Sequence, residues 1–406
     1  MLKNFSKVQR RILLGCFIAY CTTYLGRLNL SQALPGIIRE FSLSDAQAGL
    51  FQTVFAAIYA VGQLINGAIV DRIDENKHIL IGIAASALCN MLFGAFSGFP
   101  ALLLLWALNG AAQSMIWTPI VKILANRFDQ EQQSVASYFM SITLVAGHLA
   151  AWAISGIVTQ LFSWRLSFAI PGIAMSLLAP ISFLMLKSEP SEKESAVWAT
   201  QARERGSLPL LPLIFGTGLW AMLLGCTMNG FARDGVMAWA PTLLSGGSDN
   251  PVLSSLLIPI LNLVGILFGK LCYRRYEGKA RAVVGMMMAL GTIPMLLLAG
   301  VQAESALVLS LLLGCNCALM YGINPLLTVL VPLEYASVRR VALVAGLVNG
   351  FIYAGSSLTG VVTGGIIDAF GMNGAYIAWA AVCVVGAALF FLSVLGKKKL
   401  ATGSKP

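Results

Sequence analysis

Two arginines lie inside apolar segments, and a proline follows each of them eight positions later. Arg27 precedes Pro35 in the first such segment, and Arg233 precedes Pro241 at the matching place in the second half of the chain. An arginine at the centre of a membrane-spanning helix costs about 2.5–3.5 kcal/mol on insertion scales, so it usually faces a protein interior or a water-filled path. Its planar guanidinium donates paired hydrogen bonds to phosphate or carboxylate. The matched arginines therefore predict an internal repeat and an anion-binding site.

The composition indicates that these arginines are carried by membrane-spanning helices. The chain has 406 residues, of which 58% are hydrophobic and 11% charged, and its mean hydropathy is +0.80. Apolar runs of about twenty residues, the length that spans a bilayer, recur along the whole chain. We therefore expect an all-α membrane protein with twelve transmembrane helices, at residues 12–34, 47–70, 79–97, 101–124, 135–160, 166–187, 209–243, 251–272, 281–300, 304–332, 341–366 and 373–396.

The repeat and one polar stretch predict the domain organisation. Residues 188–208 are rich in Ser, Glu, Lys and Arg, and they separate the sixth expected helix from the seventh. We expect an N-terminal six-helix half at 1–187, a cytoplasmic linker at 188–208, a C-terminal half at 209–399 and a cytoplasmic tail at 400–406. The two halves should be pseudo-symmetric, because Arg27 and Arg233 occupy matching positions.

The basic residues predict how the chain is oriented. If twelve helices cross the membrane, nearly all loop lysines and arginines fall on the side of the N-terminus, and Arg39 and Arg165 are the exceptions. Positive charge collects on the cytoplasmic side of membrane proteins, so we expect both termini in the cytoplasm and a multi-pass protein of the plasma or inner membrane. The net charge of +10 is spread over these loops, which argues against a nucleic-acid partner.

The sequence lacks the motifs of common enzymes and pumps. It has no Gly-rich phosphate loop ending in lysine, no pair of catalytic carboxylates and no cluster with metal-ligand spacing. Its eight cysteines are mostly embedded in apolar runs, which is typical of small packing residues. We therefore expect no enzymatic activity, no cofactor, no metal and no ATP-driven pumping.

A segment between the second and third expected helices resembles the signature loop of the major facilitator superfamily. It reads Gly67-x3-Asp71-Arg72, and a related basic segment follows the eighth helix. The usual Gly-Arg-Arg continuation is absent, and Asp74-Glu-Asn-Lys77 stands in its place. The resemblance covers essentially the whole chain and implies parallel six-helix halves with a substrate site between them near mid-membrane. It also implies that the loop acts in gating.

Two motifs resemble the organophosphate:phosphate antiporter family, whose members exchange glycerol-3-phosphate or hexose-6-phosphate for phosphate. One is Tyr20-x3-Tyr24-x2-Arg27, and the other starts at Arg233 and places Gly, Trp, Pro and Thr at the family's offsets. The resemblance implies that the two arginines bind the phosphoryl group. It also implies that tyrosines line the substrate path, namely Tyr20, Tyr24, Tyr321 and Tyr353.

Other positions depart from this family. Gln63 stands where the family has a site lysine, and Gly230 stands where it has a site tyrosine. Leu144 aligns with a site histidine, and His148 lies one turn further along the helix. We include Gln63 and His148 among the expected substrate-contacting residues, although the helix position of His148 favours a packing role over substrate or proton binding. The organic part of the anion stays open.

Electrostatics suggests how such a site would work. Two positive charges about 10 Å apart at an effective dielectric of about 20 repel by about 1.7 kcal/mol. A bound dianion removes this repulsion, which predicts exchange of an organophosphate for phosphate by a carrier that we expect to be monomeric. One alternative is a proton-coupled symporter or exporter of an organic carboxylate, with Asp234 or His148 as the proton carrier. Another is a transporter-like membrane sensor of a phosphorylated metabolite.

Overall fold

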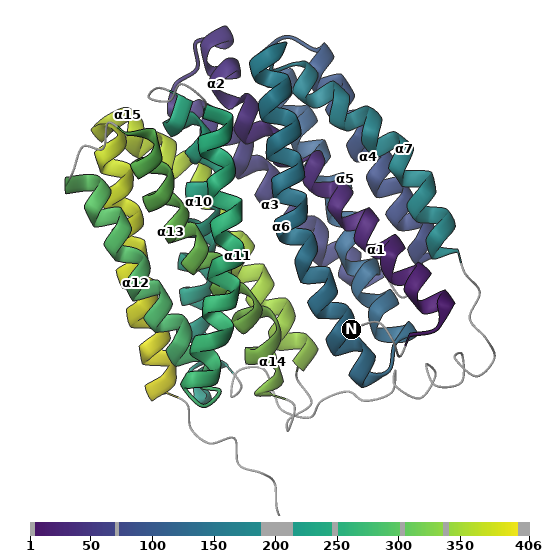
Figure 1. The fold of residues 1–406 in the computed structure, drawn as a ribbon, viewed down its shortest axis with the longest axis vertical. Coiled ribbons are helices and arrows are strands. Elements are labelled where there is room, and N and C mark those ends of the chain that lie inside the picture. The colour runs from purple at the N-terminus through teal and green to yellow at the C-terminus, as the bar shows by residue number, and fades with distance from the viewer. Residues whose placement is uncertain are drawn as a thin grey trace, which may run out of the picture. The chain divides into compact units, whose positions relative to one another are not determined.

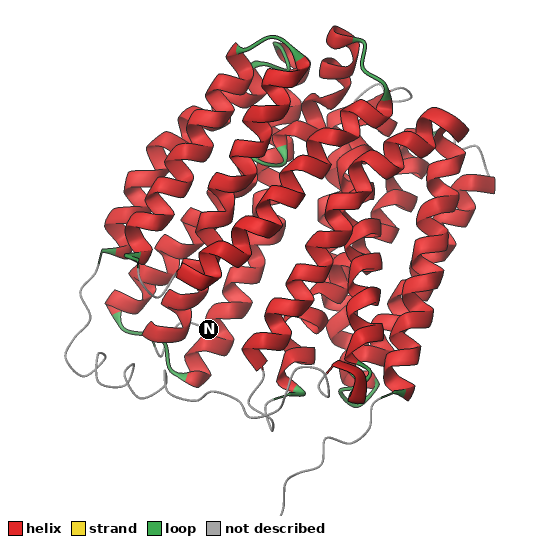
Figure 2. Cartoon of the chain, turned by 180° about the vertical axis from the view of Figure 1, so that it is seen from behind, coloured by secondary structure: helices red, strands yellow, loops and turns green. Residues whose placement is uncertain are grey.

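The computed structural model describes residues 5–69, 73–187, 214–245, 251–300, 305–335 and 341–396. All regular secondary structure in these ranges is helical, as Figure 2 shows. Eight of the described helices are long and apolar enough to cross a membrane. The predicted all-α membrane fold is confirmed, whereas the expected linker at 188–208 and the tail at 400–406 lie outside the described residues.

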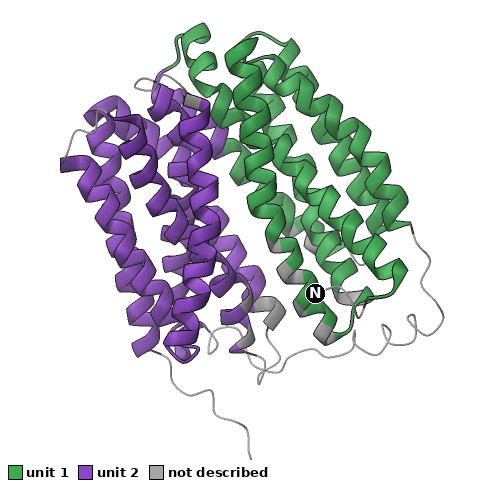
Figure 3. Ribbon diagram, in the orientation of Figure 1, with its two compact units in different colours: residues 1–43, 54–203 green, residues 44–53, 204–406 purple. Residues whose placement is uncertain are grey.

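The chain forms two compact units (Figure 3), and unit 1 comprises residues 1–43 and 54–203. Within it, α4 packs against α5 and α7, and α1 packs against α6 and α7 (Figure 1). The first helices are α1 (Lys7–Leu25), α2 (Asn29–Phe41), α3 (Asp45–Ile69), α4 (Glu75–Ala95), α5 (Phe99–Arg127), α6 (Gln130–Leu161) and α7 (Leu166–Leu186).

Unit 2 comprises residues 44–53 and 204–406. In it, α10 packs along α15, and α11 packs along α13 (Figure 1). Its helices are α10 (Leu219–Ser245), α11 (Pro251–Arg275), α12 (Ala280–Gly300), α13 (Ala306–Pro325), the π-helix η2 (Leu326–Leu330), α14 (Val331–Leu333) and α15 (Val341–Leu395). Gly371, with φ 66° and ψ −169°, divides α15 into two helices. With α15 counted as two helices, α1 and α2 as one span, and α13, η2 and α14 as one span, the described residues hold the twelve expected helices.

The start of α3 associates with unit 2, although the sequence predicted it in the N-terminal half. The Asp368 carboxylate accepts hydrogen bonds from the backbone N–H groups of Asp45 at 2.9 Å and Ala46 at 2.8 Å. The first N–H groups of a helix have no partner inside the helix, so a carboxylate placed there caps them. A distant residue of α15 therefore holds the first turn of α3.

The outer surfaces of the helices are apolar, as hydrocarbon requires. In unit 1, Leu104 is 62% exposed and Leu177 is 65% exposed, while Trp106 and Phe168 on the same two helices are buried. Helices that are hydrophobic on all sides are typical of membrane spans. The buried polar residues inside each unit are therefore candidates for a structural or binding role.

The first expected helix, 12–34, is not continuous, and this corrects the sequence prediction. Helix α1 ends at Leu25, a turn covers residues 26–28, and α2 begins at Asn29. Arg27 therefore lies in a turn between two helices. Arg233, its counterpart in the repeat, lies within the continuous helix α10, so the two arginines share their sequence spacing but not their local structure.

Candidate functional site

The turn that carries Arg27 is packed tightly against other helices of unit 1. The backbone N–H groups of Arg27 and Leu28 both donate to the carbonyl of Tyr24, at 3.3 and 3.0 Å. A Cβ atom at Gly26 would lie 2.6 Å from the sulfur of Met175 and 2.8 Å from Nδ2 of Asn90. Glycine at position 26 therefore allows the turn to approach α4 and α7 closely, and this approach fixes the place of Arg27.

Three buried side-chain amides bind the backbone at the break. Nδ2 of Asn90 and Nδ2 of Asn109 donate to the carbonyl of Gly26 at 3.1 and 2.7 Å, and Nε2 of Gln113 donates to the carbonyl of Thr23 at 3.1 Å. Broken helices are tolerated at membrane depth only where other groups satisfy the freed backbone. The amides of α4 and α5 therefore stabilise the break that presents Arg27.

These amides belong to a larger buried network. Ser86 donates to Oδ1 of Asn109 at 2.6 Å, and Asn29 donates to Oδ1 of Asn90 at 2.8 Å. Sequence reasoning missed this network. The available signal was polar residues four positions apart in apolar helices, at 86 and 90 in α4 and at 109 and 113 in α5.

Aromatic rings surround the guanidinium of Arg27. Its central carbon lies 4.8 Å from the ring centroid of Tyr24 and 5.8 Å from that of Tyr59. Tyr20 meets Tyr24 edge-on at 5.4 Å and lies 4.6 Å from the ring of Trp117. The structure thus brings the expected residues Tyr20, Tyr24 and Arg27 together, and it adds Tyr59 and Trp117.

Gln63 contacts one of the added rings. It donates through Nε2 to the hydroxyl of Tyr59 at 2.8 Å, and its Oε1 accepts from the hydroxyl of Thr118 at 2.8 Å. Tyr59 lies one helical turn before Gln63, which is a spacing that places both side chains on one face of α3. Gln63 therefore orients Tyr59 beside Arg27.

His148 packs against Tyr24. The histidine is 4% exposed, and its ring centroid lies 5.0 Å from that of Tyr24. Its Nδ1 lies 2.5 Å from the carbonyl oxygen of Leu144, one turn earlier in α6, so an Nδ1–H donates to this oxygen. In this arrangement the histidine supports the tyrosine that contacts Arg27.

In unit 2, Arg233 forms an ion pair with its neighbour in the sequence. Nε donates to Oδ1 of Asp234 at 2.7 Å, and Nη2 donates to Oδ2 at 2.9 Å. The side chains of Arg233 and Asp234 are 10% and 17% exposed. The sequence left open whether Asp234 faces the same way as Arg233. In the structure the two side chains face each other and form a bidentate ion pair.

Polar and aromatic groups of α13 and α15 surround this pair. Nη1 of Arg233 donates to Oδ1 of Asn324 at 3.2 Å, and the hydroxyl of Ser356 donates to Oδ2 of Asp234. The central carbon of the guanidinium lies 5.5 Å from the ring centroid of Tyr321, and Tyr353 is close enough to interact electrostatically with Arg233. Both expected tyrosines therefore lie near Arg233.

Asn324 and Ser356 were not predicted from the sequence. Each lies three positions after an expected tyrosine, Tyr321 or Tyr353, which is the spacing of neighbours on one helix face. The pairing with Asp234 also changes the electrostatic expectation. The sequence argument assumed two uncompensated guanidinium groups, and this assumption is wrong for Arg233.

Gly230 shows why the site lacks one tyrosine of the resembled family. A Cβ atom at Gly230 would lie 1.9 Å from the carbonyl oxygen of Ile352, and one at Gly355 would lie 1.9 Å from the carbonyl oxygen of Thr227. Helices α10 and α15 therefore touch backbone to backbone beside Arg233. No larger residue fits at position 230 without moving the helices apart.

The expected gating loop is only partly described. Gly67 lies in α3, whereas Asp71 and Arg72 lie outside the described residues. On either side of this segment, Nε2 of His78 lies 2.8 Å from Oδ1 of Asn66. This hydrogen bond joins the end of α3 to the start of α4.

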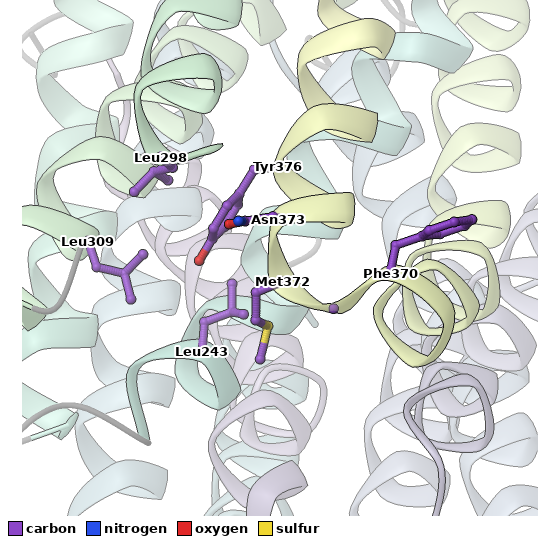
Figure 4. Close-up of a pocket in the computed structure, with 8 residues that line it drawn as sticks. Leu243, Leu298, Leu309, Phe370, Met372, Asn373 and Tyr376 are labelled. Carbon is purple, nitrogen blue, oxygen red and sulfur yellow. The ribbon is translucent and has the colours of Figure 1, made fainter. Parts of the chain in front are cut away.

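A separate cavity of about 460 Å³ lies in unit 2. It is lined by none of the expected site residues. The lining residues are Leu243, Leu298, Leu309, Phe370, Gly371, Met372, Asn373 and Tyr376 (Figure 4). Without a charged lining residue it does not suit a small anion. Within the described residues, no group of three His, Cys, Asp or Glu side chains could hold a metal ion.

Comparison with known proteins identifies the family and several similar transporters. The family profile of the Major Facilitator Superfamily matches residues 16–338. The glycerol-3-phosphate transporter of Bacillus subtilis (strain 168) is 24% identical over 96% of this chain and 93% of its own length. A probable hexose phosphate transport protein of Chlamydia muridarum is 22% identical over 96% of this chain and 91% of its own length.

Two further similarities concern a sugar acid and the fold. The hexuronate transporter of Bacillus subtilis (strain 168) is 28% identical over 51% of this chain and 49% of its own length. Among solved structures, a bacterial homolog of the human lysosomal transporter Spinster, in an inward-facing and occupied conformation, has a TM-score of 0.80 and 16% identity. That similarity covers 98% of this chain and 100% of the Spinster homolog.

Proposed function

Because the chain belongs to the Major Facilitator Superfamily, and is therefore a multi-pass membrane transporter rather than an enzyme, we propose that it carries an organic phosphate ester in exchange for inorganic phosphate. The names of the glycerol-3-phosphate and hexose phosphate relatives support this substrate class. Arg27 and Arg233 would act together as a clamp for the phosphoryl group. The carrier would expose this clamp alternately to the two sides of the membrane.

The observation that carries the proposal is that a stabilised turn places Arg27 beside two tyrosine rings. Its guanidinium carbon lies 4.8 and 5.8 Å from the ring centroids of Tyr24 and Tyr59, and cation–π attraction to these ring faces stabilises its positive charge. Three buried amides stabilise the turn that carries it.

Arg233 would supply the second arm of the clamp. A phosphate monoester carries a charge of about −1.5 to −2 at neutral pH and offers three acceptor oxygens. Such an anion can engage two guanidinium groups at once. Because Asp234 already binds Arg233, the entering anion must compete with this carboxylate.

A second candidate substrate is an organic carboxylate such as a sugar acid. The Arg233–Asp234 pair favours it, because Arg233 already binds a carboxylate through two hydrogen bonds. A substrate carboxylate could take the same position. The hexuronate transporter among the relatives supports this candidate.

The test is uptake of labelled phosphate into proteoliposomes that contain the full chain. We expect uptake only when the vesicles hold internal phosphate, and we expect glycerol-3-phosphate or glucose-6-phosphate to compete with the label. Competition by glucuronate alone, together with uptake driven by a pH gradient, would favour the carboxylate candidate. Binding of phosphate without any turnover would indicate a sensor.

We further propose the arrangement of the chain in the membrane. The distribution of Lys and Arg over the loops supports a cytoplasmic location for both termini in the plasma or inner membrane. The two halves, 1–187 and 209–399, would rock against each other as a monomeric carrier. Accessibility of cysteines introduced at the termini to a membrane-impermeant reagent tests this orientation.

A further inference from the structure

Resting on the proposed transport of an anion, we propose that Asp234 is the built-in counter-ion of Arg233, and that an anion binding at Arg233 is accompanied by uptake of one proton onto the Asp234 carboxylate. Asp234 would then decide both how tightly the anion binds and whether a proton travels with it. This goes beyond the phosphate clamp, which by itself requires no proton.

The hydrogen bonds of the Arg233–Asp234 pair show why an anion that binds Arg233 must displace or repel the Asp234 carboxylate. A guanidinium has five N–H donors in a fixed plane. Asp234 occupies the edge formed by Nε and Nη2, and Asn324 accepts from Nη1. An anion that binds the first edge displaces the carboxylate. An anion that binds the opposite edge, formed by Nη1 and Nη2, leaves two negative groups facing each other across one guanidinium.

Protonation of Asp234 relieves the conflict in either case. Once the anion neutralises Arg233, the Asp234 carboxylate loses its counter-ion while it stays largely buried, at 17% exposure. Burial without a positive partner disfavours the charged form of a carboxylic acid. A proton from the aqueous solution then forms an O–H bond on one carboxylate oxygen. The hydronium ion or buffer acid that donates the proton loses its own bond to it, and the Arg233–Asp234 ion pair breaks at the same time. The proton returns to the solution when the anion leaves.

Among the groups around Arg233, Asp234 is the one whose charge can change when the anion binds. In the described part of the chain, titratable or charged neighbours include Arg233 on its own helix, Cys317 and Tyr321 on α13 and Tyr353 on α15. Tyrosine and cysteine ordinarily keep their protons near neutral pH, and arginine stays charged. Ser356, on α15, donates its hydroxyl hydrogen to the carboxylate and does not titrate.

A proton that accompanies each bound anion has a consequence for transport. Exchange of one anion for another would carry one proton in each direction and would not depend on a pH gradient. Net uptake of an anion would carry a proton inward and would be driven by an inward proton gradient. The same site would therefore support both modes.

The experiment measures the binding of inorganic phosphate to the purified full chain in lipid nanodiscs by titration calorimetry between pH 5.5 and 7.5. The variants are wild type, Asp234→Asn and, as a matched carboxylate-to-amide control, Glu277→Gln, which changes a side chain that is 83% exposed. Phosphate itself titrates in this range. The ratio of the wild-type Kd to the Asp234→Asn Kd removes that effect, since both proteins bind the same phosphate.

We expect this ratio to rise about tenfold for each pH unit, because binding linked to the uptake of one proton weakens by that factor as protons become scarcer. Repeating the titration in buffers with different ionisation enthalpies should give one more proton taken up by wild type than by Asp234→Asn. Glu277→Gln should behave as wild type. A ratio that stays constant across the pH range, with no extra proton, would overturn the proposal.

The same titrations also distinguish two other outcomes, namely a wrong substrate and a variant that does not fold. If neither wild type nor Asp234→Asn binds phosphate, the proposed substrate is wrong, and this inference falls with it. If Asp234→Asn does not fold, Ser356→Ala takes its place. This variant removes a hydrogen bond from the carboxylate, so the pH dependence of binding should shift to higher pH. An unshifted profile in Ser356→Ala would count against the proposal.

Discussion

The substitution Asn109→Ala tests whether the buried amides hold Arg27 in place. Asn109 is fully buried, donates to the carbonyl of Gly26 at 2.7 Å and accepts from Ser86 at 2.6 Å. Alanine removes these two hydrogen bonds and a longer one that Oδ1 accepts from Nε2 of Gln113 at 3.5 Å, and it gives none of the three partners a replacement. We therefore expect a lower melting temperature and weaker phosphate binding, although Asn109 itself is not predicted to contact the substrate.

The size of the effect follows mainly from the two shorter bonds, those to Gly26 and Ser86. Hydrogen bonds between membrane helices contribute about 0.6 kcal/mol each on average and about 1.7 kcal/mol at most, so the loss is about 1–3 kcal/mol. If this loss falls on the conformation that binds the anion, affinity decreases about 5- to 150-fold. Titration calorimetry with phosphate measures the affinity, and a thermal melt in detergent confirms that the variant is folded.

A matched control removes a buried polar group elsewhere in unit 1. Ser182 is fully buried and donates only to the carbonyl of Ala179 within its own helix, at 2.9 Å. Ser182→Ala should therefore leave phosphate affinity unchanged. Wild-type affinity in folded Asn109→Ala would refute the reasoning that the amides position Arg27.

Two other predictions concern packing and pH. Gly230→Ala places a Cβ atom 1.9 Å from the carbonyl oxygen of Ile352, so it should lower the melting temperature by several degrees. Gly350→Ala, where a Cβ atom meets nothing within 4 Å, should not, and equal melts would show that the close contact is unimportant. At the end of α2, a hydrogen bond from Arg165 lowers the pKa of the Glu40 carboxyl, so the pair stabilises the fold above the ordinary pKa of glutamate and less as pH falls below it. Glu40→Gln should therefore reduce the melting temperature more at pH 7 than at pH 4, and an equal reduction at both would argue against this ion pair.

The sequence predicted the architecture because membrane helices are encoded locally. Length and apolar composition were enough to place the helices, and the glycine at 371 separates the last two where the sequence predicted a boundary. The pairing of Tyr24 with Arg27 was also predictable, since the two residues lie only three positions apart in the chain. Sequence reasoning failed where a structural feature depends on distant residues. The break after Leu25 is stabilised by amides of α4 and α5, which no local pattern in the first helix reveals.

The direction of Asp234 was unpredictable for a related reason. Adjacent positions on a helix point about 100° apart, so sequence spacing alone does not pair them. The pair forms because Ser356 donates to the carboxylate and Asn324 accepts from the guanidinium, and both come from other helices. Similarly, the absence of a tyrosine at position 230 becomes understandable only when Ile352 is seen against it.

The central claim is that Arg27 binds the phosphoryl group through its forked guanidinium. The most direct test is phosphate counterflow in proteoliposomes with wild type, Arg27→Lys and Arg39→Lys. Lysine keeps the charge but loses the fork, and Arg39 is exposed with its Nε bonded to the carbonyl of Pro35 at 3.2 Å.

A lost hydrogen bond to a charged group costs about 1.5–3 kcal/mol. The account therefore predicts that counterflow falls about tenfold or more in Arg27→Lys and stays at the wild-type rate in Arg39→Lys. Full phosphate counterflow in Arg27→Lys would contradict the account.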